Sequence, residues 1–492
     1  MNITKKILGI FAFTIGFLTM QAQDFTSSLY GSYDRYKEKS LDKRRIKHHQ
    51  IQPLINKLTK DSDFTVQKVG ESIQGRDLRL ISIGKGDINV FLWSQMHGDE
   101  PTATQAIFDI FNFLQGDAYK AEKKAILSKL KLHFLPMLNP DGAEVFTRRN
   151  ALGIDINRDA LRLQSPEGRV LKKIRDSLDA NFGFNLHDQS RYYNAERTEK
   201  PATVSYLATA YNYEKDINEV RANAMKVIVY MNNIVQQYAP GQVGRYSDDF
   251  EPRAFGDNIA KWGTSLILIE SGGYPKDQEK QEIRKLNYVS ILSALHTIAD
   301  GSYQEISIEE YEKIPKNDRN LFDLKLENVT YELNGEDYIL DLGIVRNEVD
   351  DAYHNKFHYR SVIADQGDLS TFYGYETFDA TGYKIVAPKI SQNVVMPQGN
   401  EIHVLNTLEL LKTGQAYVRA ERIPIELTYS NSPFNVVPKN FTLKNFGVSP
   451  GLNPTFFLEK DGKLQYAVIN GFLIDLNKPL SLQQIGNGII IR

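Results

Sequence analysis

Several side chains with metal-binding or acid–base chemistry stand where short apolar runs end. The stretch SQMHGDEPTATQ, residues 94–105, places His97 and Glu100 three residues apart. FNLHDQ contains His187, and SLILIE ends at Glu270. Two histidines and one carboxylate can bind a catalytic zinc ion and leave a fourth position open for water. A His-x-x-Glu pair alone is more often structural, so the surrounding sequence must decide between the two interpretations.

The elements around these residues predict an α/β fold. Apolar runs typical of buried strands occupy residues 88–96, 130–138, 182–187 and 264–270. Helical patterns follow Pro101, run from Ser165 to Ala180, cover about 216–237, and extend from about Asp277 to Ile298. Strands that alternate with helices predict a sheet with helices on both faces. Functional groups of such folds gather at the carboxyl ends of strands, where His97, His187 and Glu270 stand.

The composition predicts a folded protein without a polyanionic partner. Of the 492 residues, 41% are hydrophobic, and 59 basic residues nearly balance 61 acidic ones. We therefore expect more than one domain and no nucleic-acid binding. The chain has no cysteine, so any zinc site must use His, Asp or Glu side chains.

The first 22 residues predict an export signal. Lys5 and Lys6 precede an apolar stretch, and Ala22 follows it as a cleavage point. An uncleaved N-terminal anchor is the alternative interpretation. We expect a secreted or periplasmic protein with no stable membrane span after cleavage, because no later segment is apolar enough to cross a bilayer.

The pattern changes after about residue 300. Short alternating runs are joined by Asn334-Gly335 and Asp461-Gly462, both of which are hairpin signals. The sequence thus predicts a signal peptide over 1–22, a catalytic domain over 23–300 and a mostly β accessory domain over 301–492. A binding role for the accessory domain has no motif to support it.

The interval between the histidines carries further motifs. It contains NPDGAEVFTRRNALGIDINRD, residues 139–159. The ordered set is HxxE, NPDG, an arginine, an Asn-Arg pair, a histidine and a late glutamate. With this order the chain resembles the zinc carboxypeptidases, or funnelins, over about residues 60–300. The resemblance implies a mixed sheet with helices on both faces and one Zn²⁺ per chain, held by His97, Glu100 and His187.

The resemblance also implies roles for the other residues. Glu270 would activate water as a general base, and Arg148 would face the carbonyl oxygen as charge develops, with Arg149 in reserve. Asn157 and Arg158 would hold a terminal carboxylate, because a guanidinium matches its geometry. Tyr246 is the nearest candidate for a tyrosine that covers the substrate.

The resemblance predicts a metallocarboxypeptidase that acts on peptides or peptide-like substrates. Two alternatives share the framework, namely a deacylase of N-acyl amino acids and a peptidase of cell-wall peptides. A non-enzymatic peptide-binding domain is disfavoured, because His97, Glu100, His187 and Glu270 are all retained. The loop with Asp248, Asp249, Arg253 and Asp257 could present charge of either sign, so the preferred terminal residue stays open, as does the oligomeric state.

Overall fold

The computed structural model describes residues 25–395, 406–425, 427–430, 432–443, 446–480 and 488–492. It forms two compact units, the first ending at Arg319 and the second beginning at Asn320. Each unit is described by itself. The predicted signal segment, residues 1–22, lies outside the described residues. Within the described part of the chain, no helix has both the length and the apolar character needed to cross a membrane.

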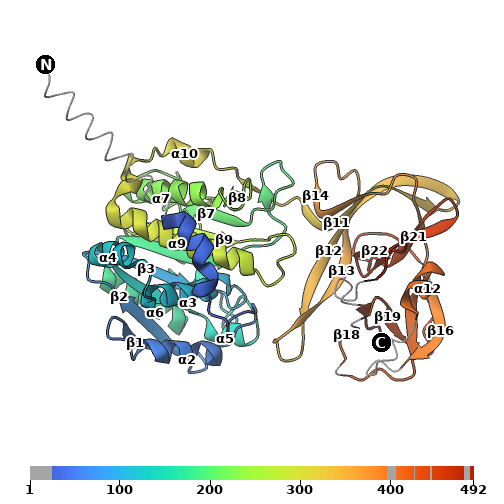
Figure 1. The fold of residues 1–492 in the computed structure, drawn as a ribbon, viewed down its shortest axis with the longest axis horizontal. Helices are drawn as coiled ribbons and strands as arrows, with labels where there is room; N and C mark the ends of the chain where they lie inside the picture. Colours follow the sequence, from blue (N-terminus) through green and yellow to red (C-terminus); the bar gives the residue numbers. More distant parts are fainter. Residues whose placement is uncertain (1–24, 396–405, 426, 431, 444–445, 481–487) are drawn as a thin grey trace, which may run out of the picture. The chain divides into compact units, whose positions relative to one another are not determined.

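A mixed sheet organises the first unit (Figure 1). Among the described residues its strand order is β1-β2-β4-β3-β5-β9-β7-β8. The strands are β1 (Thr65–Glu71), β2 (Asp77–Ile83), β3 (Ile88–Ser94), β4 (Leu130–Leu135), β5 (Phe182–Asp188), β7 (Val204–Ala208), β8 (Val243–Arg245) and β9 (Ser265–Ser271). The central strands β4, β3, β5 and β9 are parallel, whereas β1, β2 and β7 introduce antiparallel pairs. The predicted mixed sheet is confirmed.

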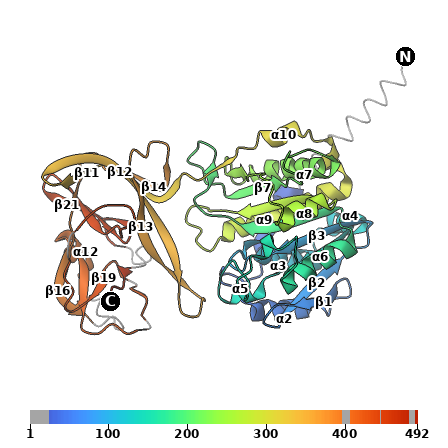
Figure 2. The ribbon, with the colours of Figure 1, turned by 180° about the vertical axis from the view of Figure 1, so that it is seen from behind.

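Helices cover both faces of this sheet (Figures 1 and 2). They are α3 (Thr102–Gln115), α4 (Lys120–Lys129), α7 (Glu219–Val235) and α9 (Gln281–Asp300) on one face, and α6 (Pro166–Leu178) and α8 (Phe255–Lys261) on the other. Strand β3 shows why the sheet needs both layers. Val90 and Leu92 enter the core with α3 and α9, while Phe91 and Trp93 enter the core with α6 and α8. All four are buried, as expected for a central strand.

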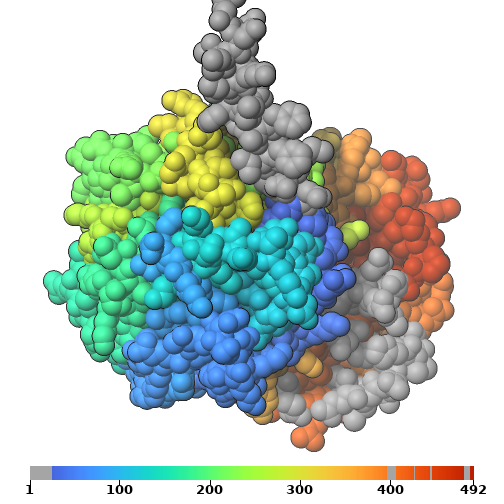
Figure 3. All heavy atoms as spheres, turned by 60° about the vertical axis from the view of Figure 1, so that its left-hand side comes forward, coloured from blue at the N-terminus to red at the C-terminus, as the bar shows by residue number. Residues whose placement is uncertain are grey.

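The segment before the sheet packs on the same unit. Residues 25–32 are helical, followed by η1 (Tyr33–Arg35) and, after a non-helical stretch, α2 (His48–Leu58). The buried Arg284–Asp109 ion pair anchors this segment, because Arg284 also donates to the carbonyl of Glu38 at 2.9 Å. In Figure 3 the early parts of the chain, coloured blue and cyan, form one continuous face.

The first unit extends past the predicted boundary at residue 300. The additional elements are η3 (Ser302–Glu305), α10 (Glu309–Glu312) and β10 (Asn317–Asp318). Tyr303 and Tyr311 lie in the core of the first unit, and β10 pairs with β6 (Asn194–Ala195). These elements are too short to show a periodic pattern in the sequence. The predicted boundary was therefore placed at residue 300, where the long helical pattern ends.

The second unit is rich in β structure, as predicted. Its larger sheet has the order β13-β12-β11-β15-β20-β21-β22, with β14 beside β11. Its strands are β11 (Leu321–Leu333), β12 (Glu336–Asp350), β13 (Phe357–Gly367), β14 (Tyr373–Asp379), β15 (Lys384–Val386), β20 (Phe456–Lys460), β21 (Lys463–Ile469) and β22 (Phe472–Asp475). Smaller sheets pair β16 (Lys389–Val395), β17 (Gln415–Ala420) and β19 (Asn435–Pro438), and β18 (Tyr429–Ser430) with β23 (Gly488–Ile489); α12 is Thr407–Lys412.

Both predicted hairpin turns are present in the second unit. Asn334-Gly335 joins β11 to β12, with φ of 56° and 85°. Asp461-Gly462 joins β20 to β21, with φ of 53° and 69°. Positive φ at both central positions is the geometry that Asn-Gly and Asp-Gly pairs favour.

Candidate active site

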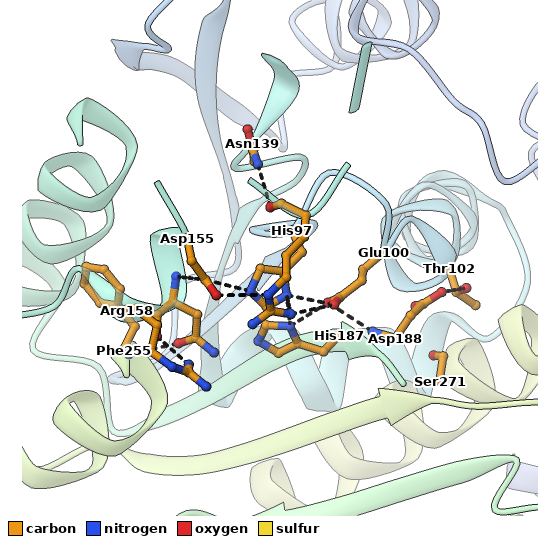
Figure 4. Close-up of polar contacts among 12 residues, drawn as sticks. His97, Glu100, Thr102, Asn139, Asp155, Arg158, His187, Asp188, Phe255 and Ser271 are labelled. Carbon is orange, nitrogen blue, oxygen red and sulfur yellow. Dashed lines mark hydrogen bonds and ion pairs between the residues drawn. The ribbon is translucent and has the colours of Figure 1, made fainter. Parts of the chain in front are cut away.

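Three ligand-type side chains converge where β3 and β5 end (Figure 4). Nδ1 of His97 lies 2.7 Å from Oε1 of Glu100, and Nδ1 of His187 lies 2.7 Å from Oε2 of the same carboxylate. The two Nδ1 atoms are 3.2 Å apart. One ligand atom from each residue lies within 4.8 Å of the others, and all three residues are buried. The structure thus assembles the predicted ligand set around one point.

The sheet register and two glycines explain this convergence. Strands β3 and β5 are parallel neighbours that pair Ser94 with Leu186, so the residues that follow them emerge at one edge. The turn at Gly98 touches the NPDG turn, since a Cβ on Gly98 would lie 2.1 Å from the carbonyl carbon of Gly142. The HxxE and NPDG motifs are therefore parts of one tightly packed junction, which tolerates no side chain at Gly98.

The charges in this cluster suit metal ligands. Burial alone would raise the pKa of Glu100, but His97 and His187 hold it well below its usual range. Burial lowers the pKa of His187. Burial also opposes protonation of His97, yet the nearby carboxylates of Glu100 and Asp155 raise its pKa to about 9. Glu100 is thus ionised and His187 is neutral, as metal binding requires, whereas His97 must release a proton when a metal binds.

Asp155 supports the site and was not predicted. Its Oδ1 lies 3.2 Å from Nε2 of His97, and its Oδ2 accepts from Nε of Arg148 at 2.9 Å. Asp155 also accepts from the backbone N–H of Asn157 at 3.0 Å. The only signal in the sequence is its position in GIDINRD, two residues before Asn157. One carboxylate therefore orients a ligand, an arginine and the start of η2 (Ile156–Arg158).

Asp188 supports the other side of the cluster and was also missed. Its backbone N–H donates to Oε2 of Glu100 at 3.3 Å. Its Oδ2 accepts from Thr102 at 2.6 Å and from the ammonium of Lys280 at 3.0 Å. The ammonium of Lys280 compensates the buried carboxylate of Asp188. The backbone of Asp188 can therefore hold the Glu100 carboxylate in place without an unpaired buried charge nearby.

Glu270 lies next to the ligands on the neighbouring strand. The register of β5 and β9 pairs His187 with Glu270. The Glu270 side chain is buried, and burial together with the carboxylate of Glu100 raises its pKa well above the ordinary value. A raised pKa is expected for a carboxylate that takes up and returns a proton near neutral pH.

The two arginine candidates are now distinguished by position. Nη1 of Arg148 lies 3.0 Å from Nδ1 of His97 and 3.5 Å from Oε1 of Glu100. Arg149 instead donates to the carbonyl of Gly153 at 2.9 Å and is exposed. Asn139 connects the NPDG turn to this loop, because its Nδ2 donates to the carbonyl of Arg148 at 3.2 Å. The structure thus brings Arg148, and not Arg149, to the cluster.

Asn157 and Arg158 lie beside α8. Oδ1 of Asn157 accepts from the N–H of Phe255 at 3.0 Å. Arg158 donates to the carbonyl of Asn157 at 2.8 Å, and its Nε lies 3.4 Å from Oε2 of Glu251. The side chain of Arg158 is 36% exposed and lines the cavity, so it can still reach a ligand.

One cavity of about 410 Å³ unites these groups. Its lining includes every predicted site residue: His97, Glu100, Arg148, Asn157, Arg158, His187, Tyr246 and Glu270. Tyr246 follows β8, and burial and then the carboxylate of Glu270 raise the pKa of its phenol. Its ring meets that of Tyr193 edge to face, with centroids 6.0 Å apart. The arrangement places the His97–Glu100–His187 cluster, the buried carboxylate of Glu270 and four polar or cationic side chains around one space.

Comparisons with known proteins agree with the motifs. A family model described as zinc carboxypeptidase matches residues 51–232. Carboxypeptidase SOL1 of Arabidopsis thaliana is 30% identical over 176 residues, which are 29% of this chain and 35% of that protein. Probable carboxypeptidase 2 of Trichophyton verrucosum is 29% identical over 133 residues, covering 27% of this chain and 24% of that protein. A solved metallo-carboxypeptidase from Burkholderia cenocepacia has a TM-score of 0.43 and 15% identity, covering 52% of this chain and 69% of the other.

Over residues 51–232 the α/β unit is similar to the zinc carboxypeptidases. The predicted resemblance to that family is confirmed, with the matched segment extending over residues 51–232. This chain spans about a third or less of the length of these two curated relatives. The match includes His97, Glu100, Arg148, Asn157, Arg158 and His187, whereas Tyr246 and Glu270 lie beyond it.

Proposed function

We propose that this protein is a zinc-dependent metallocarboxypeptidase that removes C-terminal residues from peptides. The observation that carries the proposal is the common cavity. It joins the His97–Glu100–His187 cluster to Glu270 and to the Asn157–Arg158 pair. A hydrolytic centre and a group that recognises a terminal carboxylate are thus within reach of one substrate.

The residues present fit one zinc ion per chain. Two imidazole nitrogens and a carboxylate form the donor set of a catalytic zinc site, and here all three residues are buried around one point. Asp155 and Asp188 provide the supporting hydrogen bonds that such ligands require. When bound, zinc would polarise a substrate carbonyl and lower the pKa of water, making a nucleophile available near neutral pH.

The chain's own side chains supply the remaining steps. Arg158 would pair with the terminal carboxylate through its guanidinium, while Nδ2 of Asn157 would donate to the same group. Arg148 would stabilise the carbonyl oxygen as negative charge develops. Glu270 would accept a proton from the attacking water and transfer it to the leaving amine. Tyr246 would close over the substrate from the loop after β8.

A secreted or periplasmic location is also proposed. It rests on Lys5, Lys6 and the apolar stretch up to Ala22. N-terminal sequencing of the exported protein tests the location. A mature chain that starts after Ala22 supports cleavage, and retention of Met1 supports the alternative of an uncleaved anchor.

We further propose that the second unit is an accessory domain.

Mass spectrometry of peptide digests tests the proposed activity. A carboxypeptidase shortens a peptide by one residue at a time from its free C-terminus. Cleavage only at internal bonds would contradict the proposal and indicate an endopeptidase. Release of an acyl group from N-acyl amino acids, with peptides left intact, would instead indicate a deacylase on the same framework.

A further inference from the structure

One wall of the cavity is formed beside the two-stranded ribbon of β6 and β10. Tyr193, directly before β6, and Arg319, directly after β10, both line the cavity. The strands are antiparallel and pair Asn317 with Ala195. Strand β10 lies beyond residues 51–232, the segment that matches the family model. The resemblance to zinc carboxypeptidases therefore assigns no role to Arg319.

A buried polar network holds β10 at the end of the larger sheet. Nδ2 of Asn317 donates to Oε1 of Gln189 at 2.8 Å, and Oγ of Ser205 donates to Oδ1 of Asn317 at 2.9 Å. Gln189 also donates to Oγ of Ser205 at 2.8 Å. Strand β8 packs closely here, since a Cβ on Gly244 would lie 2.0 Å from Oδ1 of Asn317. The fold thus fixes the backbone two residues before Arg319.

Arg319 differs in its partners from two other arginines of the cavity lining. Arg148 forms an ion pair with Asp155, and Arg158 forms one with Glu251. Arg319 is exposed and makes no ion pair with any other described residue. A guanidinium has five N–H donors and carries its charge at any physiological pH. The cavity therefore offers this cation to an anionic group of a ligand.

Acidic residues of the lining do not compensate this charge. Asp248 and Asp249, on the loop after β8, both pair with Lys215. Asp248 also pairs with Arg221. The charges of this loop are thus balanced within the loop and its neighbours, and the charge of Arg319 is left for a ligand.

The metal-ligand cluster lies between Arg158 and Arg319 along the network of contacts. On one side of the cluster, Asp155 contacts His97 and, as the N-cap of η2, fixes the short helix that ends at Arg158. On the other side, His187 stands near the end of β5, where the network that holds β10 begins. The two guanidinium groups are thus suited to different parts of one bound peptide.

Resting on the proposed carboxypeptidase function, we propose that Arg319 binds an acidic side chain that precedes the cleaved bond, so that the enzyme favours peptides with glutamate or aspartate at that place. A peptide with its terminal carboxylate at Arg158 and its cleaved bond at the metal ligands would continue toward Arg319. The guanidinium would pair with the acidic side chain through charge-assisted hydrogen bonds. A basic side chain at the same place would be repelled.

A peptide panel tests the proposal on the wild-type protein. All peptides share one C-terminal residue and carry Glu, Gln or Lys at each preceding position in turn. Gln matches Glu in shape and lacks only the charge. At the position that reaches Arg319, kcat/KM for Glu should exceed that for Gln by at least about threefold, as expected for an exposed ion pair. Equal or slower cleavage of the Glu peptides at every position would overturn the role of Arg319 while leaving the carboxypeptidase activity intact.

Salt provides a second readout on the same peptides. The advantage of Glu over Gln should shrink as the ionic strength rises from about 0.01 M to about 1 M, because salt screens exposed charges. An advantage that does not change over this range would contradict an ion pair with an exposed arginine.

Replacing Arg319 isolates its charge. Arg319→Gln should abolish the advantage of Glu over Gln, and Arg319→Glu should make Lys the favoured residue. Arg197→Gln is the matched control, because Arg197 is exposed on the turn after β6 and does not belong to the cavity lining. The control should leave the ratio of the two kcat/KM values unchanged. An unchanged ratio in folded Arg319→Gln, or an equal loss in Arg197→Gln, contradicts the proposal.

Failure of the proposed function has a different signature. If no peptide of the panel loses its terminal residue, the activity proposal fails. Calorimetry with the Glu and Gln peptides then still tests Arg319. Tighter binding of a Glu peptide by at least about threefold, lost in Arg319→Gln, supports the anion-binding role. Equal binding of the two peptides, or no measurable binding of either, overturns it.

Discussion

Nε2 of His97 lies 3.2 Å from Oδ1 of Asp155, so the carboxylate can take the Nε2–H of the ring as its hydrogen-bond partner. With the proton of the neutral ring on Nε2, the lone pair is on Nδ1, the atom that faces the other two ligands and Nη1 of Arg148. Supporting carboxylates of this kind fix the tautomer and orientation of a metal-binding histidine. Asp155 is therefore a positioning residue for the proposed zinc site.

Replacing Asp155 with Asn should weaken zinc binding. The expected loss is about 10–100-fold in affinity, because the ring of His97 is no longer held by a charged acceptor. Competition with a chromophoric chelator measures the affinity independently of activity. Asp176→Asn, at an exposed position on α6, serves as the control. Unchanged zinc affinity in folded Asp155→Asn would show that the contact with His97 does not support the metal.

Removing His187 should remove the metal and the activity together. His187→Ala leaves two protein ligands, which seldom hold zinc tightly. Elemental analysis should find about one zinc per wild-type chain and much less in the variant, and a strong chelator should abolish wild-type turnover. A metal-free wild-type protein with full activity would contradict the zinc site.

Glu270→Gln should separate metal binding from chemistry. The amide has the size of the carboxylate but cannot accept the proton from water. Loss of general base action typically lowers turnover by about 10²–10⁴-fold. Zinc content and thermal unfolding should resemble those of the wild type. A kcat near the wild-type value would mean that another group activates the water.

The sequence predicted the residues that stand at strand ends or in ordered motifs. His97 and Glu100 follow the buried strand β3, and His187 and Glu270 stand near the ends of β5 and β9. The register of these strands brings the four residues together. The resemblance already favoured Arg148 over Arg149, and the loop geometry places Arg148 beside His97. Asp155 carries no local pattern that distinguishes it from an ordinary loop aspartate, so its contact with His97 could not be foreseen.

The ion pairs of the loop after β8 needed three-dimensional information. Lys215 and Arg158 pair with Asp249 and Glu251, and these partners are distant from each other in sequence. The short strands β7 and β8 also escaped prediction, since five and three residues are too few to show a period.

The central claim is that Arg158 and Asn157 hold a terminal carboxylate beside a zinc centre. Matched peptides with a free or an amidated C-terminus test it most directly, because amidation removes the charge that the guanidinium recognises. A carboxypeptidase should cleave the free peptide with a kcat/KM at least about tenfold higher, which corresponds to about 1.36 kcal/mol of transition-state stabilisation. Equal cleavage of the two peptides would contradict the account.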